Sequence, residues 1–339
     1  MGSEPTLAEY IAEMVSLFRE VRRVLRDDGT FWLNVGDSYA RNPSKGTTGT
    51  PNGRNTAAMG YSGGAGLPDN AKEKDLLMVP ARLAIALCDD GWYLRQDIIW
   101  HKPNPMPESV TDRCTKSHEH IFMLTKKPRY FFDAEAVKEA AVTPAGTKGA
   151  KGSKARFETP GVNSRPPEYA VYDGTRNLRD VWTFSTKPFK GAHFATFPPE
   201  LPERCIKAGT SEKGCCPSCG LPWERVVERA KPPSVEPSDL DRFGTGDAGT
   251  HRKVGGQYQK WLDANPAKTT GWRQTCACQS ADPVPCTVLD PFGGAGTTAL
   301  VAERLGRNAV LIELNPDYAA MARERIVAAC DALTWIDMR

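Results

Sequence analysis

Hydrophobic residues near the N-terminus recur at the spacing of an amphipathic helix. The apolar positions that share one helical face are Leu7, Ile11, Met14, Val15, Phe18, Val21 and Leu25. Residues three and four positions apart line one side of a helix, so we expect a helix from about Leu7 to Arg26. Thr6 followed by Glu9 matches a capping box, in which each side chain bonds the backbone N–H of the other residue.

Helices and strands are predicted to alternate along the rest of the chain. The run from Thr30 to Val35 is short and rich in strand-forming residues, and Pro80 suits the first turn of a helix that ends near Asp89. The other expected strands are Trp92 to Trp100, Glu119 to Thr125, Thr287 to Leu289 and Asn308 to Ile312, with helices from Thr297 to Leu305 and after Pro316. This alternation predicts an α/β fold with a doubly wound, mostly parallel sheet.

Charge and composition exclude few classes of protein. The chain has 339 residues, and its 44 Lys and Arg against 41 Asp and Glu give a net charge of +3, which neither requires nor excludes a nucleic-acid partner. No apolar run approaches the roughly 18 residues that span a bilayer, and the N-terminus lacks the basic and apolar segments of a signal peptide. We therefore expect a soluble cytoplasmic protein without a membrane partner.

Three polar stretches interrupt the predicted elements. Residues 41–70 are crowded with Gly, Asn, Thr and Ser and are expected to form a mobile loop, rather than a helix or strand, that can close over a ligand. The stretch 141–169 is basic and includes Lys148, Lys151 and Lys154, which suits either a solvated linker or a contact with DNA phosphates. Residues 231–270 are expected to form an insertion.

A glycine loop between a predicted strand and a predicted helix is the strongest candidate site. It runs Asp290-Pro291-Phe292-Gly293-Gly294-Ala295-Gly296-Thr297-Thr298, at the place where parallel α/β sheets bind nucleotides. Glu313 ends the next predicted strand, where an acid accepts hydrogen bonds from ribose hydroxyls. Glycines also serve purely structural turns, but this combination favours an adenosine-containing ligand. An NAD site favours a further glycine where Thr297 and Thr298 stand.

Four ordered blocks of the chain resemble the S-adenosylmethionine-dependent DNA methyltransferases that modify exocyclic amino groups. DPFGGAGTT followed by LIELNPDY is similar to their cofactor motif and ribose acid. HFATFPPELPERCIKAGT resembles the segment that precedes that motif in the beta-type order and contacts the methionine end of the cofactor. FREVRRVLRDDGTFWLNVGDSYA and IIWHKPNPMPESVTDRCTKSHEHIFMLTK match two further blocks.

The resemblance implies a fold, a reaction and a set of site residues. The fold would be the Rossmann-like methyltransferase fold, and the reaction would be methylation of cytosine N4 or adenine N6 in double-stranded DNA, with a restriction endonuclease as counterpart. At the cofactor it places Asp290, Pro291, Phe292, Gly294, Gly296, Thr297, Thr298, Glu313, Asn315, His193, Ala195 and Phe197. Near the DNA it places Trp100, Lys102, Asn104 and Pro105, to which the basic stretch would add Lys148, Lys151 and Lys154.

The printed sequence does not show the catalytic motif of that family. The family holds the flipped base with Asp, Ser or Asn followed by two prolines and an aromatic residue, whereas the proline pairs here are followed by Glu168, Glu200 and Ser234. The run Asn315-Pro316-Asp317-Tyr318 is expected to be a helix start. Nearby catalytic candidates are Asp37, Ser38 and Tyr39. Without this motif, we expect the printed chain to be inactive. Three explanations for its absence are a gene start assigned at an internal methionine, a shortened chain, and a motif supplied by a partner chain.

Five of the ten cysteines cluster between residues 215 and 278. Cys216 and Cys219 have the two-residue gap at which two thiolates bind one zinc ion, and Cys276 and Cys278 form a second close pair. These four predict a structural zinc site against the alternative of reduced thiols without a metal. Because the second pair has one intervening residue, Cys215, His251 or Cys286 could replace one ligand.

The patterns together predict five segments along the chain. Residues 1–140 form the base-pocket half of the methyltransferase domain, 141–180 a basic insert, 181–214 a cofactor-contacting segment, 215–280 a zinc-ribbon-like insertion, and 281–339 the cofactor-binding half. Three other functions stay open: a non-catalytic DNA- or cofactor-binding fragment or split subunit, an RNA methyltransferase, and a nucleotide-dependent oxidoreductase.

Overall fold

The chain divides into two compact units, each built from segments that are distant in sequence. The computed structural model describes residue 4 and residues 6–40, 72–140, 175–186, 196–228, 268–279 and 282–329. The first unit comprises residues 1–132, 179–222 and 278–339, and the second comprises 133–178 and 223–277. Among the residues singled out above, Lys148, Lys151, Lys154, His193, Ala195 and His251 lie outside the described residues.

The first helix, α1, confirms the prediction made from hydrophobic spacing. It spans Leu7–Val24, and the capping box is complete, because Thr6 Oγ1 accepts from the Glu9 N–H and Glu9 accepts from the Thr6 N–H. No helix in the described ranges is long and apolar enough to cross a membrane.

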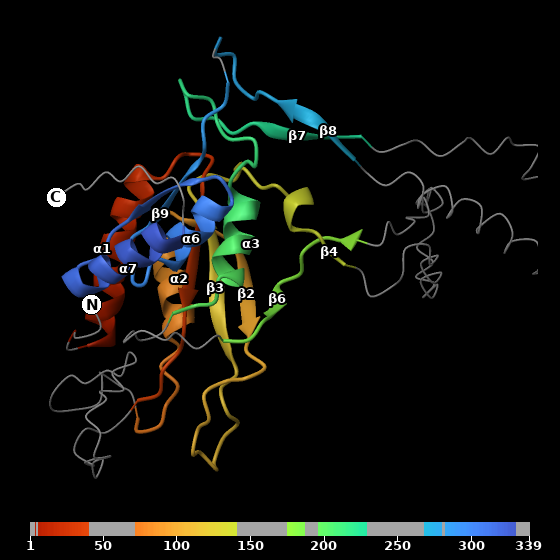
Figure 1. Ribbon diagram of the computed structural model, residues 1–339. Coiled ribbons are helices and arrows are strands. Elements are labelled where there is room, and N and C mark those ends of the chain that lie inside the picture. The colour runs from red at the N-terminus through yellow and green to blue at the C-terminus, as the bar shows by residue number, and fades with distance from the viewer. Residues whose placement is uncertain are drawn as a thin grey trace, which may run out of the picture. The chain divides into compact units, whose positions relative to one another are not determined.

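The main sheet of the first unit has four strands in the order β1-β3-β2-β6 (Figure 1). Their bounds are Thr30–Val35 for β1, Tyr93–His101 for β2, His118–Thr125 for β3 and Val181–Thr183 for β6. Strands β1 and β2 are both antiparallel to β3, and β6 is parallel to β2, so three of the four strands run in one direction. The predicted α/β sheet is thus confirmed, with β3 as the reversed strand.

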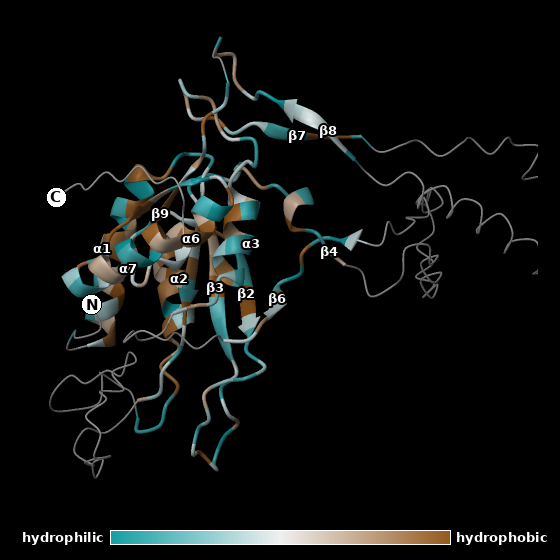
Figure 2. Ribbon diagram, in the orientation of Figure 1, coloured by the Kyte–Doolittle hydropathy of each residue, from teal (hydrophilic) through white to brown (hydrophobic). Residues whose placement is uncertain are grey.

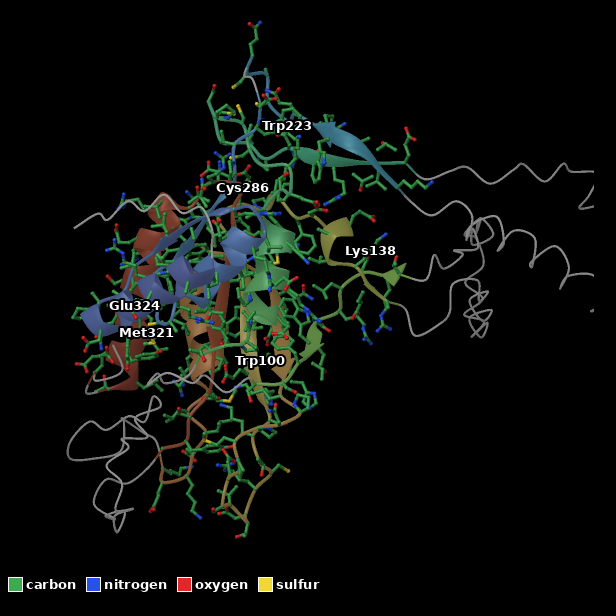
Figure 3. The ribbon with its side chains drawn as sticks, viewed as in Figure 1. Trp100, Lys138, Trp223, Cys286, Met321 and Glu324 are labelled. Carbon is green, nitrogen blue, oxygen red and sulfur yellow. The ribbon has the colours of Figure 1, made fainter. Side chains whose placement is uncertain are left out.

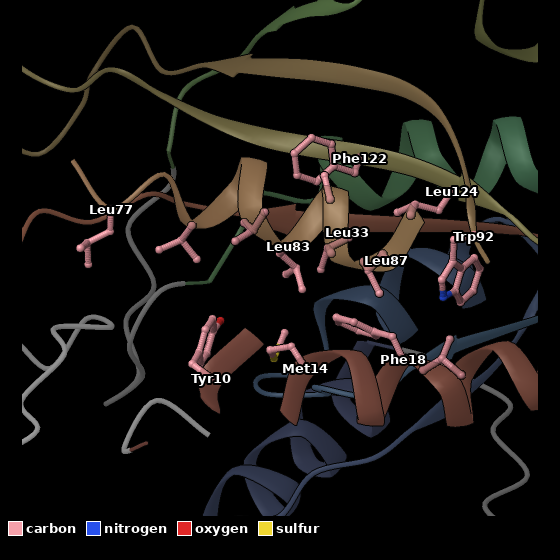
Figure 4. Packing of buried hydrophobic residues seen from close by; sticks show 14 of the residues in the cluster. Tyr10, Met14, Phe18, Leu33, Leu77, Leu83, Leu87, Trp92, Phe122 and Leu124 are labelled. Atoms are coloured by element: carbon pink, nitrogen blue, oxygen red, sulfur yellow. The ribbon is translucent and has the colours of Figure 1, made fainter. Parts of the chain in front are cut away.

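One face of this sheet packs against α1 and α2. Helix α2 spans Val79–Asp89 with Pro80 in its first turn, as predicted, and most of it is apolar (Figure 2). Phe18 of α1 and Leu83 and Leu87 of α2 are fully buried with Leu33 of β1 and Leu124 of β3 (Figure 4). Apolar burial on this scale is the main force that holds helices to a sheet.

The opposite face packs against α3, which spans Glu200–Gly209. A Cβ on Gly209 would lie 2.4 Å from Thr30 Oγ1, so glycine permits a close approach of α3 to β1. Because Thr30 and Leu33 lie at positions of opposite parity in one strand, their side chains point to opposite faces. Helices on both faces confirm the doubly wound arrangement.

The C-terminal βαβα unit agrees closely with the sequence pattern. Strands β9, Thr287–Asp290, and β10, Asn308–Leu311, pair in parallel, with Asp290 opposite Leu311. Helix α6, Thr297–Arg304, connects them, and α7, Pro316–Ala329, follows β10.

Strands β1 and β9 each keep one edge unpaired among the described residues, since β1 pairs only with β3 and β9 only with β10. Both nevertheless lie beside the same helices. The ring centroid of Phe18 in α1 is 4.9 Å from that of Phe31 in β1 and 6.4 Å from that of Phe292, just after β9. Helix α3 approaches β1 through Gly209 and shares a buried cluster with β9 through Ile206. In the described part of the chain, β1 and β9 thus belong to two separate sheets.

The second unit contains two short two-stranded antiparallel sheets and a largely buried ion pair. It contains a 3-10 turn at Glu135–Val137, strands β4 (Glu139–Ala140) and β5 (Thr175–Arg176), and strands β7 (Glu224–Glu228) and β8 (Lys268–Arg273). The Arg225 guanidinium of β7 donates to the Asp133 carboxylate, with an Nη2 to Oδ2 distance of 3.1 Å. This unit combines parts of two segments that the sequence pattern kept separate, the basic insert and the zinc-ribbon-like insertion.

Candidate cofactor site and its surroundings

The Asp290 carboxylate organises the start of the glycine loop. Its Oδ1 accepts from the Phe292 N–H at 3.0 Å, and its Oδ2 accepts from the Thr298 hydroxyl at 2.6 Å. The first bond tightens the turn after β9, and the second ties that turn to the first residues of α6. Asp290 therefore fixes the conformation of the glycine loop.

Glu313 bridges the two turns that follow β9 and β10. Its Oε2 accepts from the Gly294 N–H and its Oε1 accepts from the Asn315 N–H, both at 2.8 Å. A carboxylate offers about four acceptor positions on its two oxygens, so these bonds leave capacity for further donors. The residue predicted to accept from ribose hydroxyls therefore lies against the glycine loop.

Two glycines of the loop adopt backbone conformations that other residues rarely adopt. Gly294 has φ +50° and Gly296 has φ +74°. A Cβ on Gly296 would also lie 3.1 Å from the Ala322 Cβ of α7, so this position needs glycine both for its conformation and for helix packing.

Thr297 and Thr298 are buried, and other residues of the protein bind their hydroxyls. Thr297 is 6% exposed and accepts from the Arg325 guanidinium at 3.0 Å, while Thr298 is 8% exposed and donates to Asp290. Arg325 also donates to the Ala295 carbonyl at 2.8 Å. These side-chain bonds link α6 and α7 to the glycine loop. Because both threonine hydroxyls are already bonded within the protein, Thr297 and Thr298 would contact a cofactor through their backbone atoms.

Exposed apolar side chains occur in both turns that Glu313 joins. Phe292 is 47% exposed, Ile312 is 50% exposed and Leu314 is 95% exposed. Single exposed apolar residues are ordinary, but these three lie in the two turns that the Glu313 carboxylate bridges, so apolar surface is available close to that acceptor. Pro291 is half-buried and Asn315 exposed at the same turns, and Phe197 is half-buried just before α3.

Asp37, the first of the catalytic candidates, caps a helix. Its Oδ1 accepts from the Ser38 N–H at 2.8 Å and from the Val79 N–H, the first residue of α2, at 2.9 Å. The Ser38 carbonyl accepts from the Leu77 N–H, and the Arg113 guanidinium lies 3.9 Å from the centre of the Tyr39 ring. A carboxylate at a helix N-terminus is a stabilising arrangement.

The residues predicted to lie near DNA are mostly engaged within the protein. Trp100 is only 2% exposed, its Nε1 donates to the Phe184 carbonyl at 3.0 Å, and the Lys102 ammonium lies 4.3 Å from its ring centre (Figure 3). Because Trp100 is buried, its ring packs inside the protein and is not exposed to DNA. Lys102 pairs with Glu119, the Asn104 amide bonds the Thr186 backbone, and Pro105 is half-buried.

A polar cluster beside these residues was not anticipated from the sequence. The Glu119 carboxylate pairs with Lys102 and accepts from the Asn34 amide at 3.0 Å. The Lys116 ammonium donates to the Asp37 carbonyl at 2.5 Å, and burial lowers the pKa of Lys116. The available sequence signal for this cluster was Glu119, which lies between two histidines at the start of a strand. This cluster joins the ends of β1 and β2 to the start of β3.

The structure brings together all four cysteines of the predicted zinc site. The Sγ atoms of Cys216, Cys219, Cys276 and Cys278 lie within 4.8 Å of one another. That group does not include Cys215 or Cys286. Burial, followed by the charge of Cys215, raises the pKa of the Cys286 thiol to about 11, so Cys286 (labelled in Figure 3) is protonated at neutral pH.

The glycine loop and Glu313 thus define an α/β protein with a nucleotide-type site at the end of β9. A family model described as DNA methylase matches residues 2–216 and 285–324. The match covers more than half of the chain, and the chain belongs to the DNA methylase family. The family assignment inferred from the four sequence blocks is confirmed.

Curated relatives that match most of the chain are named as Type II methyltransferases. The chain is 35% identical over 327 residues to the Type II methyltransferase M.SmaI of Serratia marcescens, covering 96% of this chain and 77% of that protein. It is 36% identical over 329 residues to the Type II methyltransferase M.Cfr9I of Citrobacter freundii, covering 96% and 74%. Among solved structures, the PvuII cytosine-N4-specific DNA methyltransferase aligns with a TM-score of 0.49 and 16% identity, over 97% of this chain and 73% of that one.

Proposed function

We propose that this chain binds S-adenosylmethionine and serves the methylation of an exocyclic amino group, cytosine N4 or adenine N6, in double-stranded DNA. The observation that carries the proposal is the Glu313 carboxylate bonded to the Gly294 N–H at the carboxyl end of β9. Family membership supports the reaction, and the names of the relatives support a Type II restriction-modification role with an endonuclease as counterpart.

The residues present suit an adenosine-containing cofactor. Glu313 has acceptor capacity left for ribose hydroxyls, and the exposed side chains of Ile312, Leu314 and Phe292 offer apolar surface for an adenine ring. The glycine loop lets a ligand approach the backbone closely. When bound, the cofactor supplies an electrophilic methyl group on a sulfonium centre.

The acceptor amine makes its own demands on the protein. Its lone pair is delocalised into the base, so the site must accept the amine hydrogens and hold the extruded base in line with the methyl group. The printed sequence has no Asp, Ser or Asn followed by two prolines and an aromatic residue. Asn315-Pro316-Asp317-Tyr318 enters α7, where the Asp317 N–H bonds the Asn315 side chain.

The separation of β1 and β9 into two sheets suggests where a base-holding segment would lie. Strands β1 and β9 lie beside α1 and α3 without pairing with each other among the described residues. Unpaired strand edges accept further strands readily. We infer that an extended segment between β1 and β9 completes the sheet and brings the base-holding group close to the glycine loop.

We predict that the printed chain binds the cofactor but transfers methyl groups to DNA negligibly. The test is methyl transfer from radiolabelled S-adenosylmethionine to duplex DNA, with the printed chain beside a form extended by any in-frame codons that precede Met1. Chromatography of the digested DNA distinguishes N4-methylcytosine from N6-methyladenine, and RNA serves as the alternative acceptor. Rapid transfer by the homogeneous printed chain would contradict the prediction and direct attention to Asp37 and Glu119.

The second candidate function is a non-catalytic DNA- or cofactor-binding subunit, which the missing motif favours. It predicts cofactor binding without methyl transfer in either form of the chain. An oxidoreductase would instead bind NAD, and calorimetry with NAD in place of S-adenosylmethionine separates the two classes of ligand.

A further inference from the structure

We propose that Cys216, Cys219, Cys276 and Cys278 bind one structural zinc ion through four thiolates. Their Sγ atoms already lie within 4.8 Å of one another. In a tetrahedral site with zinc–sulfur distances of about 2.3 Å, the sulfurs are roughly 3.8 Å apart, so sub-ångström to ångström shifts suffice.

The first cysteine pair sits on a turn with the geometry of a metal-binding loop. The Gly220 N–H donates to the Cys216 carbonyl at 2.7 Å, and the Cys216 N–H donates to the Leu221 carbonyl at 2.9 Å. Gly220 has φ +72°, which glycine adopts without strain. These bonds fix the backbone on both sides of Cys219, so the two sulfurs need little ordering when a metal binds.

Positive charge and a side-chain donor lie at the cluster. The Arg26 guanidinium donates to the Cys219 carbonyl at 2.6 Å, and a Cβ on Gly220 would lie 2.4 Å from that nitrogen. The Gln274 amide donates to the Cys276 sulfur at 3.1 Å. Four thiolates around a divalent ion carry a net charge of −2, which a nearby guanidinium and N–H donors to sulfur stabilise.

The ligand set indicates both the metal and its role. A tetrahedron of four sulfurs selects zinc or iron rather than magnesium or calcium, which prefer oxygen. Because all four positions are filled by the protein, no site is left for water or substrate, and the ion would stabilise the fold rather than take part in catalysis.

The zinc site lies mostly outside the part of the chain that matches the family. The match ends at residue 216 and resumes at 285, so Cys219, Cys276 and Cys278 fall in the unmatched stretch. The ion would join the chain on the two sides of a long insertion and hold the first residues of that insertion in one arrangement.

The experiment measures metal content of the full chain purified with reductant and without added zinc. We expect about one zinc per chain, as four thiolates fill one tetrahedral ion. Cys216→Ser with Cys219→Ser should lose it, whereas Cys114→Ser, at an exposed cysteine away from the cluster, should keep it. Cys215→Ser and Cys286→Ser should also keep it, because neither sulfur belongs to the group.

A second measurement covers the case in which the double variant fails to fold. Replacing zinc by cobalt in the unaltered protein should give the intense thiolate-to-cobalt absorption of a four-sulfur tetrahedral site. Absence of metal after zinc is supplied, iron in place of zinc, a disulfide between two of the four cysteines, or equal loss of zinc in Cys114→Ser would each overturn the proposal.

Discussion

Replacing Glu313 by glutamine removes the acceptor on which the proposed cofactor site depends. In the unaltered protein both carboxylate oxygens are bonded to backbone N–H groups, at Gly294 and at Asn315, each at 2.8 Å. A glutamine keeps one acceptor oxygen but presents an NH₂ group where the second oxygen stood. The variant therefore loses the negative charge and one of the two bonds that order the glycine loop.

The size of the effect follows from the bonds that are lost. Hydrogen bonds to a charged group contribute roughly 1.5–3 kcal/mol, and about 1.4 kcal/mol corresponds to a tenfold change in Kd. We therefore expect Glu313→Gln to bind S-adenosylmethionine about 10- to 100-fold more weakly. Part of this loss comes from ribose hydroxyls that lack their acceptor, and part from a loop that is less ordered before binding.

Isothermal titration calorimetry with S-adenosylmethionine measures the change directly. Glu324→Gln is the matched control, since it makes the same substitution at an exposed position of α7, labelled in Figure 3. The control should retain the affinity of the unaltered protein, and thermal unfolding should show that both variants fold. An unchanged Kd for Glu313→Gln would refute the assignment of Glu313 as the ribose acceptor.

Three further predictions concern stability. Leu83→Ala should lower the free energy of unfolding by about 2–5 kcal/mol because the residue is fully buried, whereas Ile85→Ala, at a position 62% exposed in the same helix, should have little effect in denaturant titration. Asp133→Asn should cost about 1–3 kcal/mol because it removes the charge that pairs with Arg225, whose guanidinium keeps its bond to Thr269, and hydrogen exchange of β7 and β8 should rise. Lys207 holds the pKa of the Glu203 carboxyl below its ordinary value of 4.5. The stabilisation from this pair is therefore present above pH 4.5 and is lost as the pH falls through the folded-state pKa. Glu203→Gln should lower the free energy of unfolding by about 0.2–1 kcal/mol at neutral pH and by less in acid.

Local sequence signals predicted the elements and residues that depend on neighbours in the chain. The capping box at Thr6 and the helix after it depend on residues three or four positions apart, and the structure confirms both. The contact between Glu313 and Gly294 joins two turns of one βαβ unit, and a spacing motif is enough to anticipate it. The contacts of Glu119 with Lys102 and Asn34 join different strands, so the spacing of residues along the chain did not predict them.

Helix α3 and the burial of Trp100 were missed in the sequence. Helix α3 begins at Glu200 after a proline pair and has Pro202 in its first turn, which resembles a loop in sequence although proline is tolerated there. Its acidic start and Lys207 near its end were the available helix signals. Trp100 is buried against Phe184, and a strand-end tryptophan gives no local indication of that partner.

The ends of the insertion show why a metal at its base is physically reasonable. Cys215 and Val284 form an antiparallel bridge, with N–H to carbonyl bonds of 2.8 and 2.9 Å, directly at the limits of the family match. A Cβ on Gly214 would lie 2.3 Å from the Val284 carbonyl oxygen, so glycine allows this close pairing. Because the bridge already brings the two ends together, binding a metal at Cys216 and Cys278 costs the chain little additional loop-closure entropy. Its effect would be to hold the first residues of the insertion in one arrangement.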